Sequence, residues 1–329
     1  MKSIQIHRYG GPEVLQRVEA PVPEPLPGTV RVRVRHAGIN FMDIHTRQGK
    51  YATSRTYPVS LPCTLGMEGS GEVDALGEGV TTHRVGDRVA WCLVWGSYAE
   101  YAVVPAWQAV TLPEALPLDL AAASVFQGYT AHYLAHDVGR LGPGRSCLVH
   151  AASGGIGQIL IQIAKNAGAR VLATTSSADK AAVARQRGAE QVFLYDNGRF
   201  ADAVREATGG QGVDVVFDSI GKATLRDSFR ATRTRGLVVN YGNVSGSVTD
   251  LDPLELGEAG SLLLTRPRLA DHLRDAAEIR RRAADIFRAL LDGSLRIGIA
   301  GRYTLDNVEQ AHAAYEERRM VGKPVLDLG

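Results

Sequence analysis

Two hydrophobic patterns divide the sequence. From Met1 to about Leu120, short apolar segments are separated by glycine, proline and polar residues. Val30, Val32 and Val34 alternate with arginines, the period-two pattern of a strand with one solvated face. Further strands are predicted at residues 69–76, 88–92 and 98–104. This pattern predicts an all-β region that forms a partly closed barrel.

From about Asp119 to Thr265, strand-like segments alternate with helical ones. Strands are predicted at residues 146–150, 170–175, 191–195, 213–217, 237–240 and 261–265. Helices are predicted at residues 156–166 and 178–187, and a glycine follows soon after each. Such alternation implies right-handed βαβ crossovers, so this α/β region is predicted to be a doubly wound parallel sheet.

The remaining tail predicts two helices, near residues 271–291 and 306–318, and a last strand near residues 324–328. Chain termini often lie close together, so we expect the tail to pack on the first region. The predicted organisation is one domain made of residues 1–122 and 267–329, with a second domain of residues 123–266 between them.

The strongest chemical signal is the glycine-rich segment Ala151-Ala-Ser-Gly-Gly-Ile-Gly157, between a predicted strand and a predicted helix. The helix start directs backbone N–H groups and a partial positive charge at one point, which suits a pyrophosphate. Gly154 allows close approach of the phosphates and Gly157 allows close helix packing. Ala152 stands where the usual GxGxxG motif has its first glycine. The segment predicts a dinucleotide site.

The end of the next strand indicates which dinucleotide is bound. An NAD site usually places an acidic residue there, to bind the ribose 2′-hydroxyl. Here Thr174, Thr175 and Ser176 occupy the stretch, with Lys180 nearby and Asp179 about one helical turn late. A carboxylate would repel a 2′-phosphate, so its absence favours NADPH.

Composition excludes several other classes. The 37 basic and 35 acidic residues give a formal net charge of +2, too near neutral for an electrostatic nucleic-acid binder. The three cysteines, Cys63, Cys92 and Cys147, form neither a disulfide framework nor a CxxC pair. No signal peptide precedes the first strand, and no apolar run approaches the roughly 20 residues of a membrane span. We expect a cytoplasmic protein.

The sequence resembles the zinc-free quinone oxidoreductases of the medium-chain dehydrogenase/reductase superfamily over essentially its whole length. The motifs that carry the resemblance are Gly38-Ile-Asn-Phe-Met-Asp43, Gly66-Met-Glu-Gly-Ser-Gly71, Val85-Gly-Asp-Arg-Val89, the Ala151–Gly157 loop, Asp218-Ser-Ile-Gly221 and Tyr241-Gly-Asn-Val-Ser-Gly246, in that order. The resemblance implies a GroES-like β-barrel catalytic domain made from both chain ends, with a Rossmann domain between them.

The resemblance also implies that no metal is used. Zinc-dependent relatives carry a cysteine and a histidine ligand where this sequence has Asn40 and Met67, and the four-cysteine block of a structural zinc site is missing. Glu68 remains without that neighbour. His132 and His136 are spaced i, i+4 but lack the glutamate of a zincin motif. These two histidines, like His312, are interpreted as structural.

The site residues implied by the resemblance fall into groups. Asn40, Phe41 and Thr130 are expected near the nicotinamide. The pyrophosphate is assigned to Ser153, Gly154, Gly155, Ile156 and Gly157. The adenosine 2′-phosphate is assigned to Ser176, Lys180 and Tyr195. The later strand ends contribute Ser219, Tyr241, Gly242 and Asn243, and Arg318 reaches back from the last helix. Relatives often have a tyrosine at the position of His45 and a lysine at that of Gln127, so both differences bear on substrate fit.

Without a metal to polarise the substrate, the acceptor must take a hydride readily, as a quinone does. Asn40, His45 and Gln127 are the candidates for stabilising the developing oxyanion, and Arg47, Tyr51 and Tyr129 are the candidates for substrate binding. One alternative is a zinc-free enone or enoyl reductase, with Tyr51 or Tyr129 as proton donor. Another is an NADPH-binding protein without catalytic activity. The resemblance also implies that the apolar strand at residues 261–265 lies at the edge of the Rossmann sheet, where pairing with a second copy would give a homodimer.

Overall fold

The computed structural model describes residues 1–195, 200–317 and 320–329. These residues form two compact units, unit 1 with Met1–Tyr129 and Leu273–Gly329, and unit 2 with Thr130–His272. The sequence predicted domain boundaries at 122/123 and 266/267, whereas the two units of the structure divide at 129/130 and 272/273. The chain first passes from unit 1 to unit 2 within helix α2 (Leu118–Tyr133).

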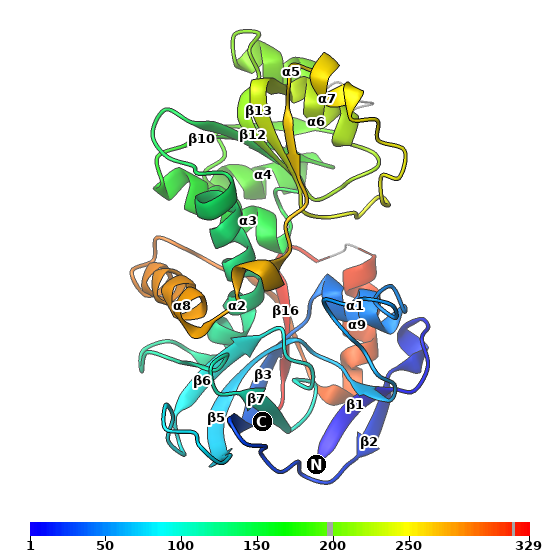
Figure 1. Ribbon diagram of the computed structural model, residues 1–329, viewed down its shortest axis with the longest axis vertical. Coiled ribbons are helices and arrows are strands. Elements are labelled where there is room, and N and C mark those ends of the chain that lie inside the picture. The colour runs from blue at the N-terminus through cyan, green and yellow to red at the C-terminus, as the bar shows by residue number, and fades with distance from the viewer. Residues whose placement is uncertain (196–199, 318–319) are drawn as a thin grey trace. The chain divides into compact units, whose positions relative to one another are not determined.

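Unit 1 is built mainly of antiparallel strands (Figure 1). In chain order they are β1 (Lys2–Ile6), β2 (Gln16–Glu19), β3 (Thr29–Gly38), β4 (Cys63–Thr64), β5 (Glu68–Leu76), β6 (Arg88–Cys92), β7 (Tyr101–Pro105), β8 (Val110–Thr111), β15 (Ile299–Tyr303) and β16 (Lys323–Asp327). One sheet has the order β2-β1-β4, and the larger one has the order β15-β16-β3-β5-β6-β8, with β7 paired to β3. The helical segments are η1 (Pro12–Val14), α1 (Phe41–Arg47), α8 (Ala276–Leu291), η4 (Leu305–Asn307) and α9 (Val308–Glu316).

Strand β3 organises this unit. Its valines Val30, Val32 and Val34 are at most 1% exposed, as the period-two pattern predicted. Residues 29–33 pair with β7, and β5 pairs along nearly the whole of β3. The last residues of β3 pair with β16. The C-terminal tail therefore packs on the first region of the chain, as expected, and this pairing brings Lys323 beside α1 and β5.

Unit 2 is a six-stranded parallel sheet of order β11-β10-β9-β12-β13-β14, which confirms the predicted doubly wound α/β fold (Figure 1). Its strands are β9 (Ser146–Val149), β10 (Arg170–Thr175), β11 (Gln191–Leu194), β12 (Val213–Asp218), β13 (Thr232–Asn240) and β14 (Leu263–Thr265). Its helices are α3 (Gly155–Asn166), α4 (Ala178–Arg187), α5 (Phe200–Ala207), α6 (Leu225–Ala231) and α7 (Leu254–Glu258), with a π-helical turn η2 (Leu134–Val138) and a 3₁₀ turn η3 (Leu269–His272).

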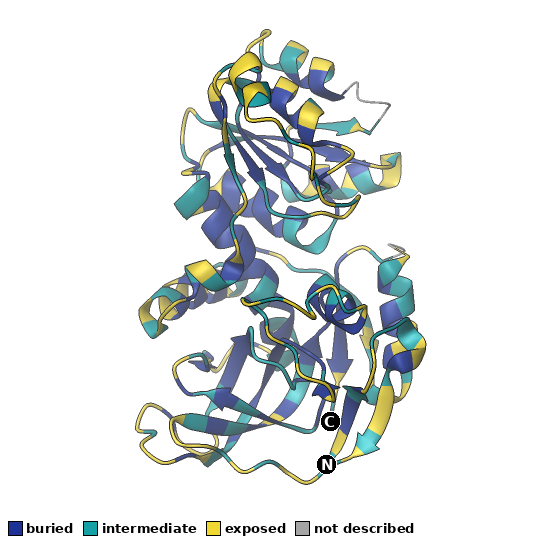
Figure 2. Cartoon of the chain, turned by 45° about the vertical axis from the view of Figure 1, so that its right-hand side comes forward, coloured by how far each residue is buried: buried dark blue, intermediate teal, exposed yellow. Residues whose placement is uncertain are grey.

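The central strands of unit 2 are buried on both faces (Figure 2), as expected for a parallel sheet. Helices α5 and α6 pack together over one face, where their apolar residues meet Leu148, Leu172 and Val216. Helices α3 and α4 pack together on the other face. Within the described residues, no helix is long and apolar enough to span a bilayer.

Candidate cofactor and substrate site

The glycine-rich loop follows β9 and opens α3 in unit 2. Gly154 is the N-cap of this 12-residue helix. A Cβ on Gly157 would lie 2.5 Å from the Ala151 carbonyl oxygen and 2.9 Å from Ala152 Cα, so only glycine fits. The first N–H groups of an α-helix have no acceptor within the helix. Ser153 and the four residues after it therefore form a continuous segment with the geometry of an anion site.

At the end of β10, Ser176 is exposed and Lys180 is partly exposed in the first turn of α4. The Lys180 ammonium donates to the Ser176 hydroxyl at 3.3 Å. The two preceding threonines, Thr174 and Thr175, are buried. An ammonium and a hydroxyl without a carboxylate in the strand end suit a 2′-phosphate better than a free 2′-hydroxyl.

The ends of β12 and β13 lie against each other. Asp218 is fully buried and its carboxylate accepts hydrogen bonds from the backbone of Ile220 and Gly221, at 2.8 and 2.9 Å. A Cβ on Gly242 would lie 2.3 Å from the Ser219 carbonyl oxygen. The predicted residues Ser219, Tyr241, Gly242 and Asn243 therefore gather at the carboxyl ends of two adjacent strands, where such sheets bind ligands.

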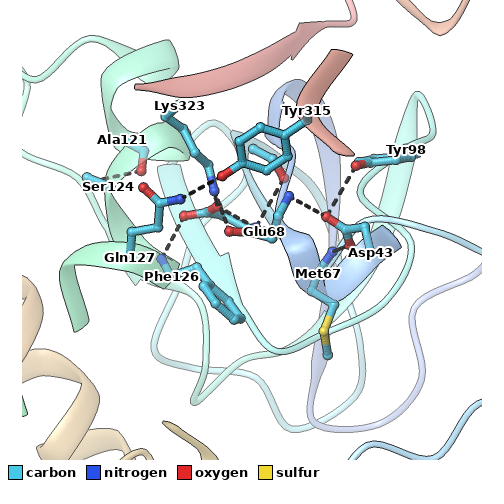
Figure 3. Close-up of polar contacts among 12 residues, drawn as sticks. Asp43, Met67, Glu68, Tyr98, Ala121, Ser124, Phe126, Gln127, Tyr315 and Lys323 are labelled. Carbon is cyan, nitrogen blue, oxygen red and sulfur yellow. Dashed lines mark hydrogen bonds and ion pairs between the residues drawn. The ribbon is translucent and has the colours of Figure 1, made fainter. Parts of the chain in front are cut away.

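In unit 1, Asn40 caps the N-terminus of α1 and is 2% exposed. Its side-chain oxygen accepts from the Lys323 ammonium at 2.5 Å, and its amide nitrogen donates to Glu68 at 2.9 Å (Figure 3). Lys323 also donates to Glu68 at 2.5 Å, and both side chains are fully buried. The other Glu68 oxygen accepts from the Phe126 backbone at 2.6 Å. We call Asn40, Glu68 and Lys323 the Lys323 cluster.

Beside the Lys323 cluster lies the carboxyl group of Asp43. It accepts from the backbone N–H of Asn40 at 2.8 Å and from the Tyr98 hydroxyl at 3.2 Å. Burial raises the pKa of Asp43 to about 7, against the opposing effects of the Asn40 N–H and Lys323. Tyr98 is 3.2 Å from His312 Nε2. A polar chain thus leads from Asp43 to α9.

The sequence placed Arg47 at the substrate site, but its side chain is fully buried between α1 and α9. The guanidinium donates to Glu316 at 2.5 Å and lies 3.4 Å from His312 Nδ1. Because arginine can only donate, His312 Nδ1 is an acceptor and Nε2 carries the proton. Burial, reinforced by the charge of Arg47, lowers the pKa of His312 to about 3. His312 is structural, as predicted.

His45 lies in a row of aromatic rings in unit 1. Its ring centroid is 6.2 Å from that of Phe41 and 6.2 Å from that of Tyr51. Phe41 is 4.6 Å from Tyr315. Burial, and then the charge of Lys50, lowers the pKa of His45 to about 4. At neutral pH this imidazole is uncharged and has one donor and one acceptor nitrogen.

Helix α2 carries the remaining candidates. Gln127 donates to the Tyr315 hydroxyl at 3.4 Å, and its buried carbonyl oxygen has no hydrogen-bond partner among the described residues. The same is true of the buried Tyr129 hydroxyl within the part of the chain that the structure describes. Burial raises the pKa of Tyr129 well above its usual value, so the phenol is a neutral donor. Thr130 begins unit 2 and is 6% exposed, and Arg318 lies outside the described residues.

The region around Asn40 and Met67 is poor in metal ligands. Among the described residues, no group of three or more His, Cys, Asp or Glu side chains could hold a metal ion. Lys323 places an ammonium between Glu68 and Asn40, and a second cation there would be repelled. His132 and His136 have ring centroids 4.7 Å apart, in α2 and the π-helical turn.

Several residues of these networks were not identified from the sequence: Lys323, Tyr98 and Tyr315. Lys323 had no local signal, because its partners lie 283 and 255 residues away in the chain. One signal was available for α1. Asn40 and Asp43 have the spacing of a capping box, and both of its hydrogen bonds are present.

Two family models match the chain. One is described as an alcohol dehydrogenase GroES-like domain and covers residues 26–114, and the other is described as a zinc-binding dehydrogenase and covers residues 155–276. A quinone oxidoreductase of Pseudomonas aeruginosa is 39% identical, over 99% of both chains. A 2-haloacrylate reductase of a Burkholderia species is 38% identical, over 98% of this chain and 97% of its own. The crystal structure of Escherichia coli quinone oxidoreductase complexed with NADPH superposes with a TM-score of 0.95, at 36% identity, over 99% of this chain and 100% of that one.

Proposed function

The chain belongs to the quinone oxidoreductase family of the medium-chain dehydrogenase/reductase superfamily, and from this premise we propose that it transfers a hydride from NADPH to a quinone without a metal ion. The observation that carries the proposal is the Lys323 cluster. It holds an ammonium between Glu68 and Asn40, and the family resemblance places a cysteine zinc ligand of zinc-dependent relatives at the position of Asn40. The acceptor must therefore be reactive by itself.

The residues of unit 2 fit NADPH. The start of α3 would hold the pyrophosphate, Ser176 and Lys180 would hold the 2′-phosphate, and the ends of β12 and β13 would line the site. When bound, NADPH supplies the hydride from its nicotinamide ring. Phe41 and Thr130 remain our candidates beside that ring, and Arg318 remains a candidate cofactor residue.

The candidates for the oxyanion are unequal. His45 is neutral at pH 7 and retains a donor nitrogen, and the Gln127 amide nitrogen carries a second N–H besides the one that donates to Tyr315. Asn40 already donates to Glu68 and Gly38, at 2.9 and 3.4 Å. We therefore propose that His45 and Gln127 stabilise the reduced oxygen, while Asn40 positions α1. Tyr51 and Tyr129 would contact the substrate, and Arg47 would act indirectly by fixing α1 on α9.

The experiment that tests this proposal follows the oxidation of NADPH and NADH in the presence of quinones, after treatment with a chelator. We expect turnover with quinones, a preference for NADPH and no loss of rate on chelation. The Lys180→Ala variant should raise the KM for NADPH about tenfold, because it removes a charged hydrogen bond to a phosphate, and leave that for NADH unchanged. A rate that depends on added zinc contradicts the metal-free mechanism.

A second candidate function is the reduction of an activated carbon–carbon double bond, favoured by the 38% identity to a 2-haloacrylate reductase. The buried Tyr129 phenol, which has no hydrogen-bond partner within the described residues, would be its proton donor. Activated enones and 2-haloacrylate in the same assay distinguish the two. Turnover restricted to these acceptors, and lost in Tyr129→Phe, identifies the second function. Binding of NADPH without any turnover would indicate a protein that is not an enzyme.

We also propose a cytoplasmic homodimer. Strand β14 lies at the end of the sheet order in unit 2, and Leu263 on it is 64% exposed. Pairing with the same strand of a second copy would cover this edge. The three cysteines are buried free thiols, consistent with a reducing compartment. Light scattering that shows a monomer at every concentration contradicts the dimer.

A further inference from the structure

A groove runs along helix α8 in unit 1. Its volume is about 880 Å³, within the range of small-molecule sites in proteins. One wall is the face of α8 from Arg280 to Asp292, and the other is formed by residues 82–83 and 109–113, around β8. Between Arg280 and Leu291 the helix advances roughly 16 Å, at 1.5 Å per residue. None of the residues that line the groove belongs to the candidate cofactor and substrate site.

The floor of this groove is apolar. Val110 and Leu112 from one wall, and Phe287 from the other, line it and are at most 8% exposed. Ala284 and the 45% exposed Leu291 continue the apolar surface along the rim. A ligand that lies along α8 therefore exchanges water for hydrocarbon over most of its length, which favours an apolar chain.

The polar groups of the wall opposite α8 are engaged within that wall. His83 is 5% exposed, and its Nε2 lies 3.1 Å from the Ala109 carbonyl oxygen. Because a carbonyl oxygen can only accept, Nε2 donates this hydrogen bond. His83 Nδ1 is paired with the Thr82 hydroxyl at 2.9 Å. A charged group of a ligand must therefore be bound from α8.

The two arginines that line the groove on α8 differ in their partners. Arg288 donates to Asp285 at 2.7 Å, so its charge is already compensated. For Arg280, no described carboxylate is a partner. The helix positions three and four residues to either side of it, from which a counter-charge would reach it, are all alanine: Ala276, Ala277, Ala283 and Ala284. A guanidinium binds a carboxylate through two parallel hydrogen bonds, so Arg280 is suited to an anion.

The groove is also polar from end to end. Asp292 is the C-cap of α8, where the last carbonyl groups of the helix add partial negative charge. An anionic group is repelled from this end and attracted to Arg280, three turns earlier in α8. A bound ligand therefore places its negative group at Arg280 and its apolar part toward Leu291.

We propose that this groove binds a free long-chain carboxylate, with its head group on Arg280 and its alkyl chain along Phe287 toward Leu291. The single uncompensated guanidinium matches a head group of one negative charge. The narrow apolar floor along the helix matches a linear chain. This site is independent of the proposed reduction of quinones and would bind its ligand in the absence of NADPH.

The test measures the Kd of octanoate, decanoate and dodecanoate for the wild-type chain by titration calorimetry. Each methylene that enters the groove should lower the Kd about threefold to fourfold. Dodecanol has the same chain without the charge and should bind about tenfold more weakly than dodecanoate. A Kd that does not depend on chain length, or equal binding of dodecanol, overturns the proposal.

Variants of α8 locate the binding. Arg280→Gln should raise the Kd of dodecanoate about tenfold and remove its advantage over dodecanol. Arg281→Gln removes the same charge from the next residue, which is exposed and does not line the groove, and should change neither Kd. Ala284→Trp should abolish the binding of both ligands, because the ring fills the groove from an exposed position. Ala277→Trp, exposed on α8 outside the groove, is the matched control.

The same variants separate the proposed ligand from a lipid surface. Wild-type chain should not sediment with vesicles of phosphatidylglycerol, whose head groups also carry one negative charge. Sedimentation that Arg280→Gln abolishes would assign the groove to a membrane and overturn binding of a free carboxylate. Equal losses of dodecanoate binding in Arg280→Gln and Arg281→Gln would show a general effect of charge and would also overturn the proposal.

Discussion

In unit 1 the buried carboxylate of Glu68 is paired with the ammonium of Lys323, whereas in unit 2 the buried carboxylate of Asp218 is held by neutral donors. An ion pair compensates a buried charge with one strong contact, so loss of either partner leaves the other charge exposed to a low dielectric. Asp218 accepts from four donors, which are the backbone N–H groups of Ile220 and Gly221 and the hydroxyls of Thr224 and Ser228. Loss of one leaves the others in place.

The partners also differ in their separation along the chain. Lys323 is 255 residues from Glu68, and the contact forms only when β16 pairs with β3. Ser228 is 10 residues from Asp218, and the two are joined by one loop and the start of α6. The Lys323 cluster therefore joins the C-terminal strand β16 to the first region of unit 1. The hydrogen bonds to Asp218 instead join segments of unit 2 that are close in the sequence.

The largest predicted effect breaks the ion pair. Lys323→Met leaves the Glu68 carboxylate buried without a counter-charge and should lower the free energy of unfolding of unit 1 by about 3–5 kcal/mol. Urea unfolding followed by tryptophan fluorescence measures this unit alone, because Trp91, Trp95 and Trp107 all lie in it.

The matched control removes both charges. The double variant Glu68→Gln/Lys323→Met should recover most of the lost stability, since a buried pair can often be replaced by neutral groups without loss. If the double variant is as unstable as Lys323→Met, the loss comes from packing rather than from the unpaired charge.

A smaller effect is expected from a change in the glycine loop of unit 2. Gly157→Ala places a Cβ 2.5 Å from the Ala151 carbonyl oxygen, so the loop must shift. Removing one phosphate hydrogen bond should weaken NADPH binding roughly tenfold to hundredfold. Gly257→Ala in α7 meets no atom within 4 Å and serves as the control. Equal affinities of the two variants, measured by calorimetry, would show that the loop tolerates the Cβ.

The contrast between the units also explains what could be predicted from the sequence. Strands β6 and β10 and helix α4 lie at the predicted residues, because alternation, apolar runs and a helix-ending glycine are local signals. The glycine loop was found for the same reason. The buried pair His150 and Ser228, whose side chains lie 2.9 Å apart in unit 2, was not identified from the sequence. A buried polar side chain has no pattern of its own until its partner is known.

In unit 1 the same limit applies more strongly. Arg47 was interpreted as a candidate substrate residue at the mouth of the site. Helix α9, more than 260 residues later, supplies Glu316 and His312 and buries it. Asn40 was identified from the sequence as a candidate site residue. Its amide is held between Lys323 and Glu68. This arrangement could not be predicted, because it depends on the pairing of the distant strands β3 and β16.

The smallest predicted effect is a pH dependence that belongs to unit 1. His312 has a pKa of about 3 in the folded protein, against about 6.5 when unfolded. Below pH 6.5 the unfolded chain binds a proton that the folded chain does not, so stability falls as the pH falls. His312→Asn loses the hydrogen bonds to Arg47 and Tyr98 and should be less stable at pH 7.5. At pH 5.5 the difference in unfolding free energy between the variant and the wild type should narrow by about 1.4 kcal/mol, because only the wild type keeps an imidazole neutral there.

Asp43, at the other end of the polar chain, titrates with the opposite sign, since its raised pKa makes the folded state bind the proton more tightly between pH 3.8 and about 7. A difference that does not narrow on acidification, in tryptophan-detected unfolding at the two pH values, would mean that the His312 imidazole does not carry this pH dependence.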